Sequence, residues 1–398
     1  MNTLLRRLQP YPFEKLHTLL QEVTPSPRHR PINLSIGEPR HPVAPWIRET
    51  MERSLDGISR YPTVRGEEGL RRAAAGWLER RFDLGSGTVD PQTQVLPVNG
   101  TREALFSIVQ AVIGPDATDA VVLMPNPFYQ IYEGAAIMAG ATPIHVPALE
   151  KNHFLPDYGA LPAELLARTR LLFLCSPANP TGAVTPEDEL VRLLELAETH
   201  DFILAADECY SEIWYHRPPP GLLQVARKTG RDAFERCLAF HSLSKRSNMP
   251  GARSGFVAGD ARILDGYFKL RTYTGCATPP FIQQAAIAAW NDESHVAENR
   301  TQYRLKLEDA LEILQPSLSV QAPEAGFYLW LKVPGGGESF ARHLFQWYNV
   351  TVLPGTYLGR GDGTENPGFS FIRVAMVQPR DENREGILRI AAAVADLA

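Results

Sequence analysis

The sequence lacks any long apolar run. No stretch reaches the roughly 18 consecutive apolar residues of a membrane-spanning helix, so we expect no membrane span. Residues Met1 to Gln9 contain arginines without a following apolar stretch, and we therefore expect no signal peptide and a cytoplasmic protein. An excess of positive charge is also missing. The formal net charge of -5 gives no bulk basic field that would attract nucleic acid or anionic lipid.

Several motifs of common enzyme classes are absent. There is no GxGxxG after a strand and no GxxxxGK[ST], which disfavours an enzyme that depends on nicotinamide or ATP. There is no GxSxG elbow of a serine hydrolase and no HExxH of a zinc hydrolase. Cysteine is scarce, and none of the four residues shows CxxC spacing, so we expect reduced, buried thiols and no metal site: Cys175, Cys209, Cys237 and Cys276.

What the chain does contain is an alternation of strand-like and helix-like segments. Thr185-Pro186-Glu187-Asp188 predicts the start of a helix, with threonine as N-cap, proline at the first helical position and two carboxylates in the first turn. This helix is expected to run to about His200. Short apolar segments around it predict strands at Ala120–Met124, Arg170–Leu174, Phe202–Ala206 and Cys237–Phe240. This order predicts an α/β fold with a mainly parallel central sheet and helices on both faces.

The ends of the chain predict a smaller α/β domain. A short helix is expected from Tyr11 to Val23 and a helical stretch from about Gln283 to Leu314. Short strands follow at Gly326–Val333 and Phe371–Val374. We expect residues 1–45 to form an N-terminal arm and part of the small domain, 46–285 the large domain and 286–398 the small C-terminal domain.

Polar residues follow three of the predicted strands of the large domain. Asn179 lies after the first, Asp207 and Tyr210 after the second, and Lys245 and Arg253 after the third. In parallel sheets, ligands bind beyond the carboxyl ends of the strands. Each residue alone has an ordinary structural explanation as a turn, cap, core or surface residue, but together they indicate a site.

The motifs resemble those of the fold-type I, class I/II aminotransferases over essentially the whole chain. The family's lysine signature, S-x-S-K followed by R-x-G, is present as Ser242, Ser244, Lys245, Arg253 and Gly255. Further matching segments are Ser35–Pro39, Tyr61–Gly66 with Leu70 and Arg71, Asn99–Leu105, and Arg373.

The resemblance implies pyridoxal 5'-phosphate as cofactor, held by Lys245 as a Schiff base. An amine with phosphate ligands beside it can join a carbonyl cofactor and later carry a proton from the substrate. Asp207 would pair with the pyridine nitrogen, which keeps the ring cationic and electron-withdrawing. Asn179 and Tyr210 would hydrogen-bond the ring phenolate. Tyr129 would stack on the ring, with Phe128 or Tyr132 as alternatives and plain core packing as the ordinary explanation.

The cofactor phosphate would lie at the start of a helix that Gly100 and Thr101 open and that runs to about Val112. Free N–H groups and the helix dipole favour an anion there. Ser242, Ser244 and the guanidinium of Arg253 add side-chain donors. By resemblance, Tyr61 reaches the phosphate of the neighbouring subunit, which implies a homodimer with shared active sites.

The substrate would be an amino acid paired with a 2-oxo acid. A lone arginine among apolar neighbours, such as Arg373, is costly unless paired, and we expect it to clamp the substrate α-carboxylate near Gly37 and Asn179. Arg102 lies in the first turn of the phosphate helix. It is a candidate to bind a distal carboxylate of the substrate, and it is also a candidate cofactor contact. The ordinary explanation for this arginine is a surface salt bridge with Glu103 or a neighbour. Arg40 is a weaker candidate. An acidic substrate such as glutamate, paired with 2-oxoglutarate, follows.

Overall the chain looks like the bacterial N-succinyldiaminopimelate aminotransferases of lysine biosynthesis. The segments that carry this are Pro10–Leu16, Asn33–Pro39, Pro125–Tyr129 and His241–Asn248. An aspartate, alanine or LL-diaminopimelate aminotransferase is the alternative, and a carbon–sulfur lyase is a further rival because it shares the cofactor residues. A non-catalytic ligand sensor is disfavoured because the catalytic positions are all filled.

Overall fold

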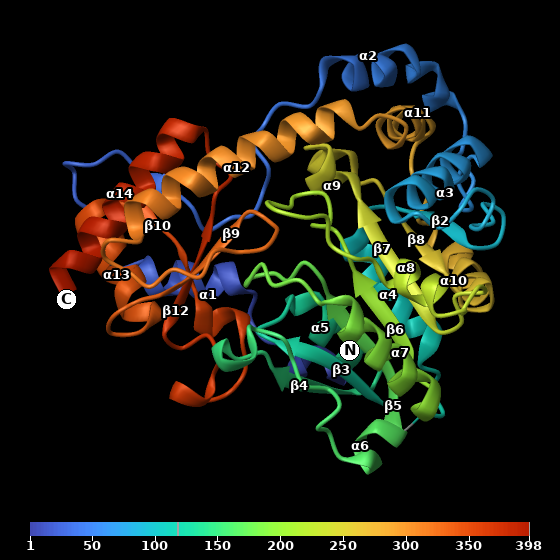
Figure 1. The fold of residues 1–398 in the computed structure, drawn as a ribbon, viewed down its shortest axis with the longest axis horizontal. Coiled ribbons are helices and arrows are strands. Elements are labelled where there is room, and N and C mark those ends of the chain that lie inside the picture. Colours follow the sequence, from blue (N-terminus) through green and yellow to red (C-terminus); the bar gives the residue numbers. More distant parts are fainter. Residues whose placement is uncertain (118, 398) are drawn as a thin grey trace.

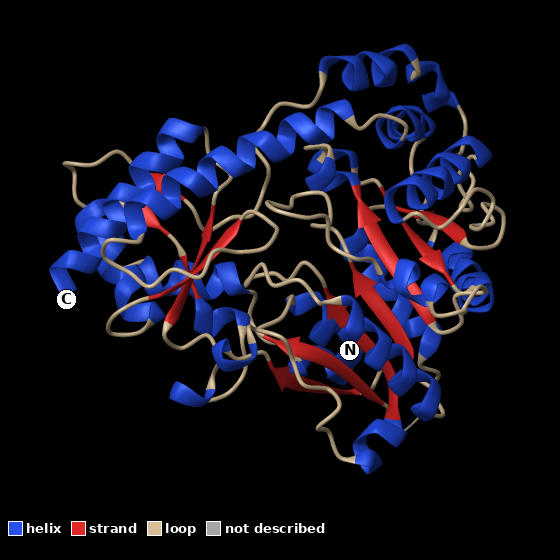
Figure 2. Ribbon diagram, viewed as in Figure 1, coloured by secondary structure: helices blue, strands red, loops and turns tan. Residues whose placement is uncertain are grey.

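The computed structural model describes residues 1–117 and 119–397. Its main feature is a seven-stranded sheet in the order β2-β8-β7-β6-β5-β3-β4 (Figures 1 and 2). All pairs are parallel except those of β8, which runs antiparallel to β2 and β7. The strands are β2 Val95–Val98, β3 Val121–Asn126, β4 Thr142–Pro147, β5 Thr169–Cys175, β6 Ile203–Asp207, β7 Cys237–Ser242 and β8 Gly255–Gly259. The predicted mainly parallel α/β fold is therefore confirmed.

Central strands of the large sheet are buried on both faces. Along β5, Leu172 and Leu174 belong to one hydrophobic cluster, while Leu171 and Phe173 belong to another on the opposite face. This alternation explains why the strands are continuous apolar runs. Helices supply both covers: α3 Glu68–Phe82, α7 Glu187–His200, α8 Leu222–Lys228 and α11 Pro280–Trp290 on one face, and α4 Thr101–Val112, α5 Gln130–Met138 and α10 Ala261–Thr274 on the other.

A separate core lies under the C-terminal part of the chain. It is built around a three-stranded antiparallel sheet, β11 Leu353–Pro354, β12 Phe371–Ala375 and β9 Tyr328–Lys332. A two-stranded parallel pair joins β1 Ile32–Asn33 to β10 Val350–Thr351, so the N-terminal segment contributes here. The helices are α12 Ser294–Leu314, α13 Gly337–Tyr348 and α14 Arg380–Leu397. Because the two cores are distinct, we propose the division into 1–45, 46–285 and 286–398.

The remaining helices are short or lie at the edges. They are α1 Pro12–Leu20, α2 Pro45–Arg53, α6 Ala163–Arg168 and α9 Leu243–Arg246, with 3-10 turns at Thr3–Arg7, Leu55–Ser59, Glu150–Asn152, Pro250–Ala252, Gly355–Leu358 and Gly363–Glu365. In the part of the chain that the structure describes, no helix combines the length and the apolar character that a membrane crossing requires.

Three local predictions were wrong. The stretch expected as one helix from Gln283 to Leu314 is two helices, because Asn291 ends α11 and the Asp292 carboxylate accepts from the His295 backbone N–H at the start of α12. Thr185 is not the N-cap of α7, and Pro186 is not its first residue. The helix begins at Glu187, Pro186 before it has extended backbone, and the Thr185 N–H donates to Ser176 Oγ.

The third concerns the first helix, which covers Pro12–Leu20 instead of Tyr11 to Val23. Proline occupies its first helical position, where no N–H is needed. The chain turns back at Val23, whose N–H bonds the Leu20 carbonyl.

Candidate active site

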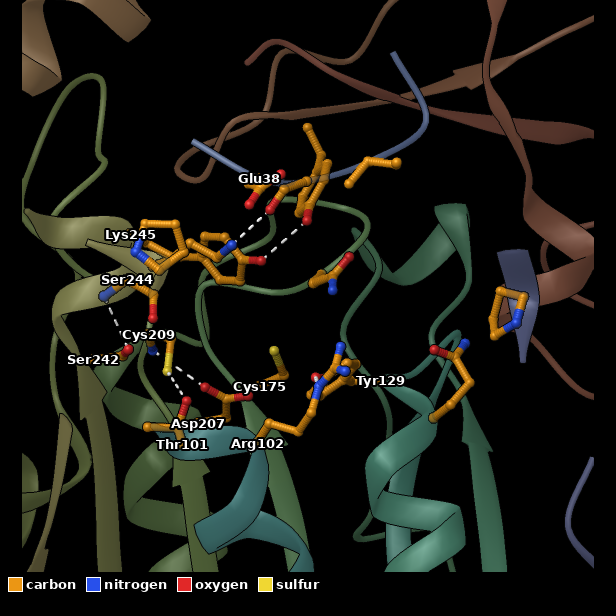
Figure 3. Close-up of a pocket in the computed structure, with 18 of the residues that line it drawn as sticks. Glu38, Thr101, Arg102, Tyr129, Cys175, Asp207, Cys209, Ser242, Ser244 and Lys245 are labelled. Carbon is orange, nitrogen blue, oxygen red and sulfur yellow. Dashed lines mark hydrogen bonds between the residues drawn. The ribbon is translucent and has the colours of Figure 1, made fainter. Parts of the chain in front are cut away.

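The carboxyl ends of β5, β6 and β7 open into a cavity of about 500 Å³. Side chains from the C-terminal core close its other side. Figure 3 shows Lys245 and Ser244 on one side, Arg102 and Tyr129 on the other, Asp207 below and Glu38 above. The predicted site residues that line it are Gly37, Thr101, Arg102, Tyr129, Asn179, Asp207, Tyr210, Ser242, Ser244, Lys245, Arg253 and Arg373. The structure thus brings together residues from distant parts of the chain.

Asp207 is the last residue of β6 and is almost fully buried. Its Oδ2 accepts a hydrogen bond from the Tyr132 hydroxyl at 2.8 Å, and its Oδ1 accepts from the Cys209 backbone N–H at 3.3 Å. Burial raises the pKa of the Asp207 carboxyl, and these donors oppose the rise. A cationic ring nitrogen beside it would favour the charged form further.

Lys245 lies in the short helix α9, directly after β7. Its Nζ donates to the Gly37 carbonyl at 2.6 Å. Burial lowers the pKa of the Lys245 amine to about 8, although Cys209 acts in the opposite direction. An amine with this pKa is partly neutral at physiological pH, as a nucleophile must be.

Gly100 and Arg253 form a cradle at the start of α4. Gly100 has a φ of 81°, and a Cβ at this position would lie 2.2 Å from Arg253 Nη2. Arg253 Nη1 donates to the Pro250 carbonyl at 2.9 Å, which holds the guanidinium beside the helix start. Thr101 begins the twelve-residue helix, so its free N–H groups point the same way. Together these donors suit a phosphate.

Arg373, on β12, is buried and has only neutral hydrogen-bond partners. Nη1 donates to Asn179 Oδ1 at 3.1 Å and Nη2 to the Ser35 carbonyl at 2.7 Å. Its Nε has no partner among the described residues, and the guanidinium carbon lies 4.4 Å from the centre of the Tyr328 ring. A buried cation with neutral neighbours is suited to binding a carboxylate.

Arg102 points into the cavity and not to Glu103. Its Nε donates to the Tyr129 hydroxyl at 2.6 Å and its Nη2 to the Tyr11 hydroxyl at 2.9 Å. Glu103 instead forms an ion pair with Arg271. The guanidinium of Arg102 is therefore also available to a carboxylate ligand.

Of the three aromatic candidates for stacking, Tyr129 alone lines the cavity. Tyr132 is fully buried and stacks on Phe173, with ring centroids 4.4 Å apart. Phe128 is buried beside His145. Tyr129 thus remains the proposed ring contact.

Besides the weaker candidate Arg40, two predicted residues lie outside the cavity lining. Gly100 sits just behind Thr101, where it leaves room for Arg253. Tyr61 is fully exposed on the surface and does not line the cavity of its own chain.

Sequence reasoning missed several lining residues. Tyr328 closes the cavity beside Gly37, where an added Cβ would lie 1.8 Å from the tyrosine hydroxyl, and it hydrogen-bonds Tyr210 at 3.1 Å. Cys209 lies between the predicted site residues Asp207 and Tyr210, and its Sγ contacts Thr101 Oγ1 at 3.1 Å. Tyr11 and Glu38 also line the cavity. Tyr11 and Glu38 lie within the segments Pro10–Leu16 and Ser35–Pro39, whose resemblance to the family was the signal that could have indicated them.

Comparison with known proteins decides the family. The family model described as aminotransferase class I and II matches residues 29–390. The chain belongs to the class I and II aminotransferases. This aminotransferase is 33% identical to the LL-diaminopimelate aminotransferase of Desulforudis audaxviator over 383 residues, which cover 94% of each chain.

Solved structures agree with the family. An aminotransferase from Neisseria meningitidis is 43% identical to this aminotransferase, with a TM-score of 0.95, and the match covers 99% of this chain and 100% of that one. A protein named probable N-succinyldiaminopimelate aminotransferase from Thermus thermophilus is 26% identical with a TM-score of 0.84, covering 96% and 100%.

Aminotransferases of this family use pyridoxal 5'-phosphate, and the cavity fits that group. The cradle that Gly100 leaves open is lined by phosphate donors, and the buried carboxyl of Asp207 and the amine of Lys245, with its lowered pKa, line the same cavity. When bound, the cofactor supplies an electron sink for the carbanion formed at the substrate Cα.

Proposed function

We propose that this aminotransferase transfers the amino group between N-succinyl-LL-2,6-diaminopimelate and 2-oxoglutarate, in lysine biosynthesis. The observation that carries the proposal is that the cavity holds, besides Arg253 at the phosphate cradle, two further guanidinium groups, Arg102 and Arg373, whose hydrogen-bond partners among the described residues are all neutral. A substrate with two carboxylates satisfies both. Glutamate and the succinylated substrate each provide them.

The proposed roles of the chain's own groups follow from their positions. Lys245 moves the proton at the substrate Cα, because its amine is neutral enough to accept it. Asp207 faces the ring nitrogen, and Asn179 and Tyr210 face the ring oxygen. The helix start at Thr101, with Ser242, Ser244 and Arg253, holds the phosphate.

Arg373 binds the α-carboxylate in this proposal, held in place by Asn179 and the Ser35 carbonyl. Arg102 binds the far carboxylate, oriented by the hydroxyls of Tyr11 and Tyr129. Both guanidinium groups are fixed before substrate arrives, which lowers the entropy cost of binding.

A second candidate is LL-diaminopimelate itself as amino donor. The matched relative from Desulforudis audaxviator carries that name. Glu38 also favours it, because the carboxylate lines the cavity and suits the free distal ammonium that succinylation removes. The two substrates therefore differ in their need for Glu38.

The deciding experiment is a panel of amino donors: N-succinyl-LL-diaminopimelate, LL-diaminopimelate, glutamate, aspartate and alanine. The absorbance change of the bound cofactor gives kcat/KM for each donor in a single half-reaction. The highest value for the succinylated donor supports the proposal. The highest value for LL-diaminopimelate, together with its specific loss in Glu38→Gln, supports the second candidate. Glu52→Gln, at an exposed position of α2, is the matched control.

We further propose a homodimer in which each subunit completes the other's site. The exposed Tyr61 is the residue that would cross the interface. Exposed Leu55 and Ile58 beside it give this surface the apolar character of an interface core.

A further inference from the structure

Lys306, on the long helix α12, is a buried ammonium outside the cavity. It is only 1% exposed, and its Nζ meets the His41 ring at 2.8 Å instead of a carboxylate. A buried cation without an anionic partner costs free energy that an apolar residue of the same length would not. We therefore examine which groups the Lys306 side chain contacts.

The hydrogen bonds that start at Lys306 form a chain of defined direction. Burial lowers the pKa of Lys306 to about 8, so at pH 7 the amine is still mainly an ammonium, which can only donate, and His41 Nε2 accepts. The neutral ring then carries its proton on Nδ1 and donates to Asn299 Oδ1 at 2.7 Å. The oxygen of Asn299 is thereby fixed toward His41, and its Nδ2 donates to the Lys245 carbonyl at 3.3 Å.

The surroundings support this assignment. Burial lowers the pKa of His41, the hydrogen bond to Asn299 opposes this and Lys306 adds to it; the net pKa lies below its usual value, so the ring is mainly neutral at pH 7. Asn248 Nδ2 also donates to Asn299 Oδ1, at 3.1 Å, in agreement with this atom being an acceptor. The Tyr303 ring lies 4.5 Å from the His41 ring and fixes its plane.

One face of α12 carries the chain. Asn299, Tyr303 and Lys306 are four and three residues apart, so they share one side of the helix. Figure 1 shows α12 running from α11, beside the large sheet, to α14 in the C-terminal core. The face that contacts Lys245 thus belongs to the element that links the two cores.

Lys245 is held at both of its ends by connected segments. Its backbone carbonyl accepts from Asn299, while its Nζ donates to the carbonyl of Gly37. Gly37 and His41 lie in the same short segment over the cavity. We propose that Lys306, His41 and Asn299 are positioning residues that set the reach of Lys245 toward the cofactor. The proposal rests on Lys245 being the lysine that carries the cofactor.

Two variants of the full-length enzyme test it. Lys306→Met keeps an unbranched side chain, one heavy atom shorter, and removes the donor. Asn299→Asp keeps the acceptor for His41 and removes the donor to Lys245. Arg304→Met and Gln302→Glu, at exposed positions of the same helix, make the same chemical changes outside the chain.

The first measurement is the rate at which each apoenzyme captures pyridoxal 5'-phosphate on Lys245, trapped with borohydride and located by mass spectrometry. The second is the pH at which the absorbance of the lysine-bound cofactor changes. We expect Asn299→Asp to unfold at the wild-type temperature and Lys306→Met to unfold at that temperature or above it. Both variants should capture the cofactor about 10- to 100-fold more slowly than the wild type. Both should also shift the pH at which the absorbance of the lysine-bound cofactor changes. The two controls should match the wild type.

A double variant completes the test. If one chain connects the residues, the two effects are not additive, because the second substitution removes little that the first left. Wild-type capture rate and an unshifted pH in Lys306→Met would overturn the proposal, and so would additive effects. Trapping of the wild-type cofactor on a different lysine would instead refute the assignment of Lys245, so the two failures are distinguishable.

Discussion

At the residue scale, the lowered pKa of Lys245 gives a prediction for pH. The neutral amine is the nucleophile, so the capture rate of the cofactor by apoenzyme should rise about tenfold per pH unit below its pKa. Because burial sets that pKa to about 8, the rate should level off above pH 8. An ordinary lysine would show a rate that still rises at pH 10. Stopped-flow absorbance measures this rate. The Lys245→Ala variant is the control: it should bind the cofactor without a covalent link and lose turnover.

The two cavity arginines should behave differently. Arg373→Ala should raise KM for every amino acid, since each has an α-carboxylate. Arg102→Ala should raise KM for glutamate and leave alanine unchanged. Loss of a charge-assisted hydrogen bond costs about 1.5–3 kcal/mol, which corresponds to roughly 10- to 100-fold. Arg40→Ala is the control, because Arg40 is exposed and outside the cavity lining. Equal effects of Arg102→Ala on alanine and glutamate would refute the assignment.

The sequence predicted the residues whose chemistry and position after a strand coincide, such as Asp207 and Lys245. It could not predict Tyr132 as the donor to Asp207, since three aromatics lie within Phe128–Tyr132 and only the start of α5 decides which points where. Tyr328 was also out of reach. Its contact with Gly37 joins residues almost 300 positions apart, and spacing does not encode such a contact.

At the scale of elements, the start of α4 gives the next prediction. Gly100→Ala would place a methyl group 2.2 Å from Arg253 Nη2 and strain a backbone with a φ of 81°. Arg253 must then move, and the phosphate loses a charge-assisted donor. Cofactor affinity should fall by about tenfold or more. Equilibrium dialysis measures this, with Gly114→Ala as control, because Gly114 lies just beyond the other end of the same helix and an added Cβ there meets no atom within 4 Å. Unchanged affinity would contradict the cradle.

The central strands β3, β5, β6 and β7 of the large sheet were predictable because they are buried apolar runs, whereas β2, β4 and β8 were not predicted. The reversed direction of β8 was not, because a strand's direction depends on the path of the preceding connection and not on its composition. The break between α11 and α12 depends on side-chain bonds of Asp292, which competed with helical continuity. The pairing of β1 with β10 joins chain segments that no local pattern connects.

At the scale of the whole molecule, the cavity exists only because two cores meet. Asp207 ends β6 and Lys245 follows β7 of the large sheet, whereas Arg373 and Tyr328 come from the small one. A shift of one core relative to the other would move the carboxylate clamp away from the amine. Helix α12, which touches both, is therefore well placed to keep the two in register.

The last prediction concerns the dimer. Lys245→Ala and Tyr61→Ala should each be nearly inactive as pure homodimers. If Tyr61 serves the partner's site, a hybrid of the two has one site with both residues intact and one with both lost. Random mixing should then restore activity to about one quarter of the wild-type sites. If Tyr61 acts within its own chain, every site of the hybrid lacks one residue and mixing restores nothing. Activity assays after subunit exchange, with unmixed samples as controls, distinguish the two arrangements.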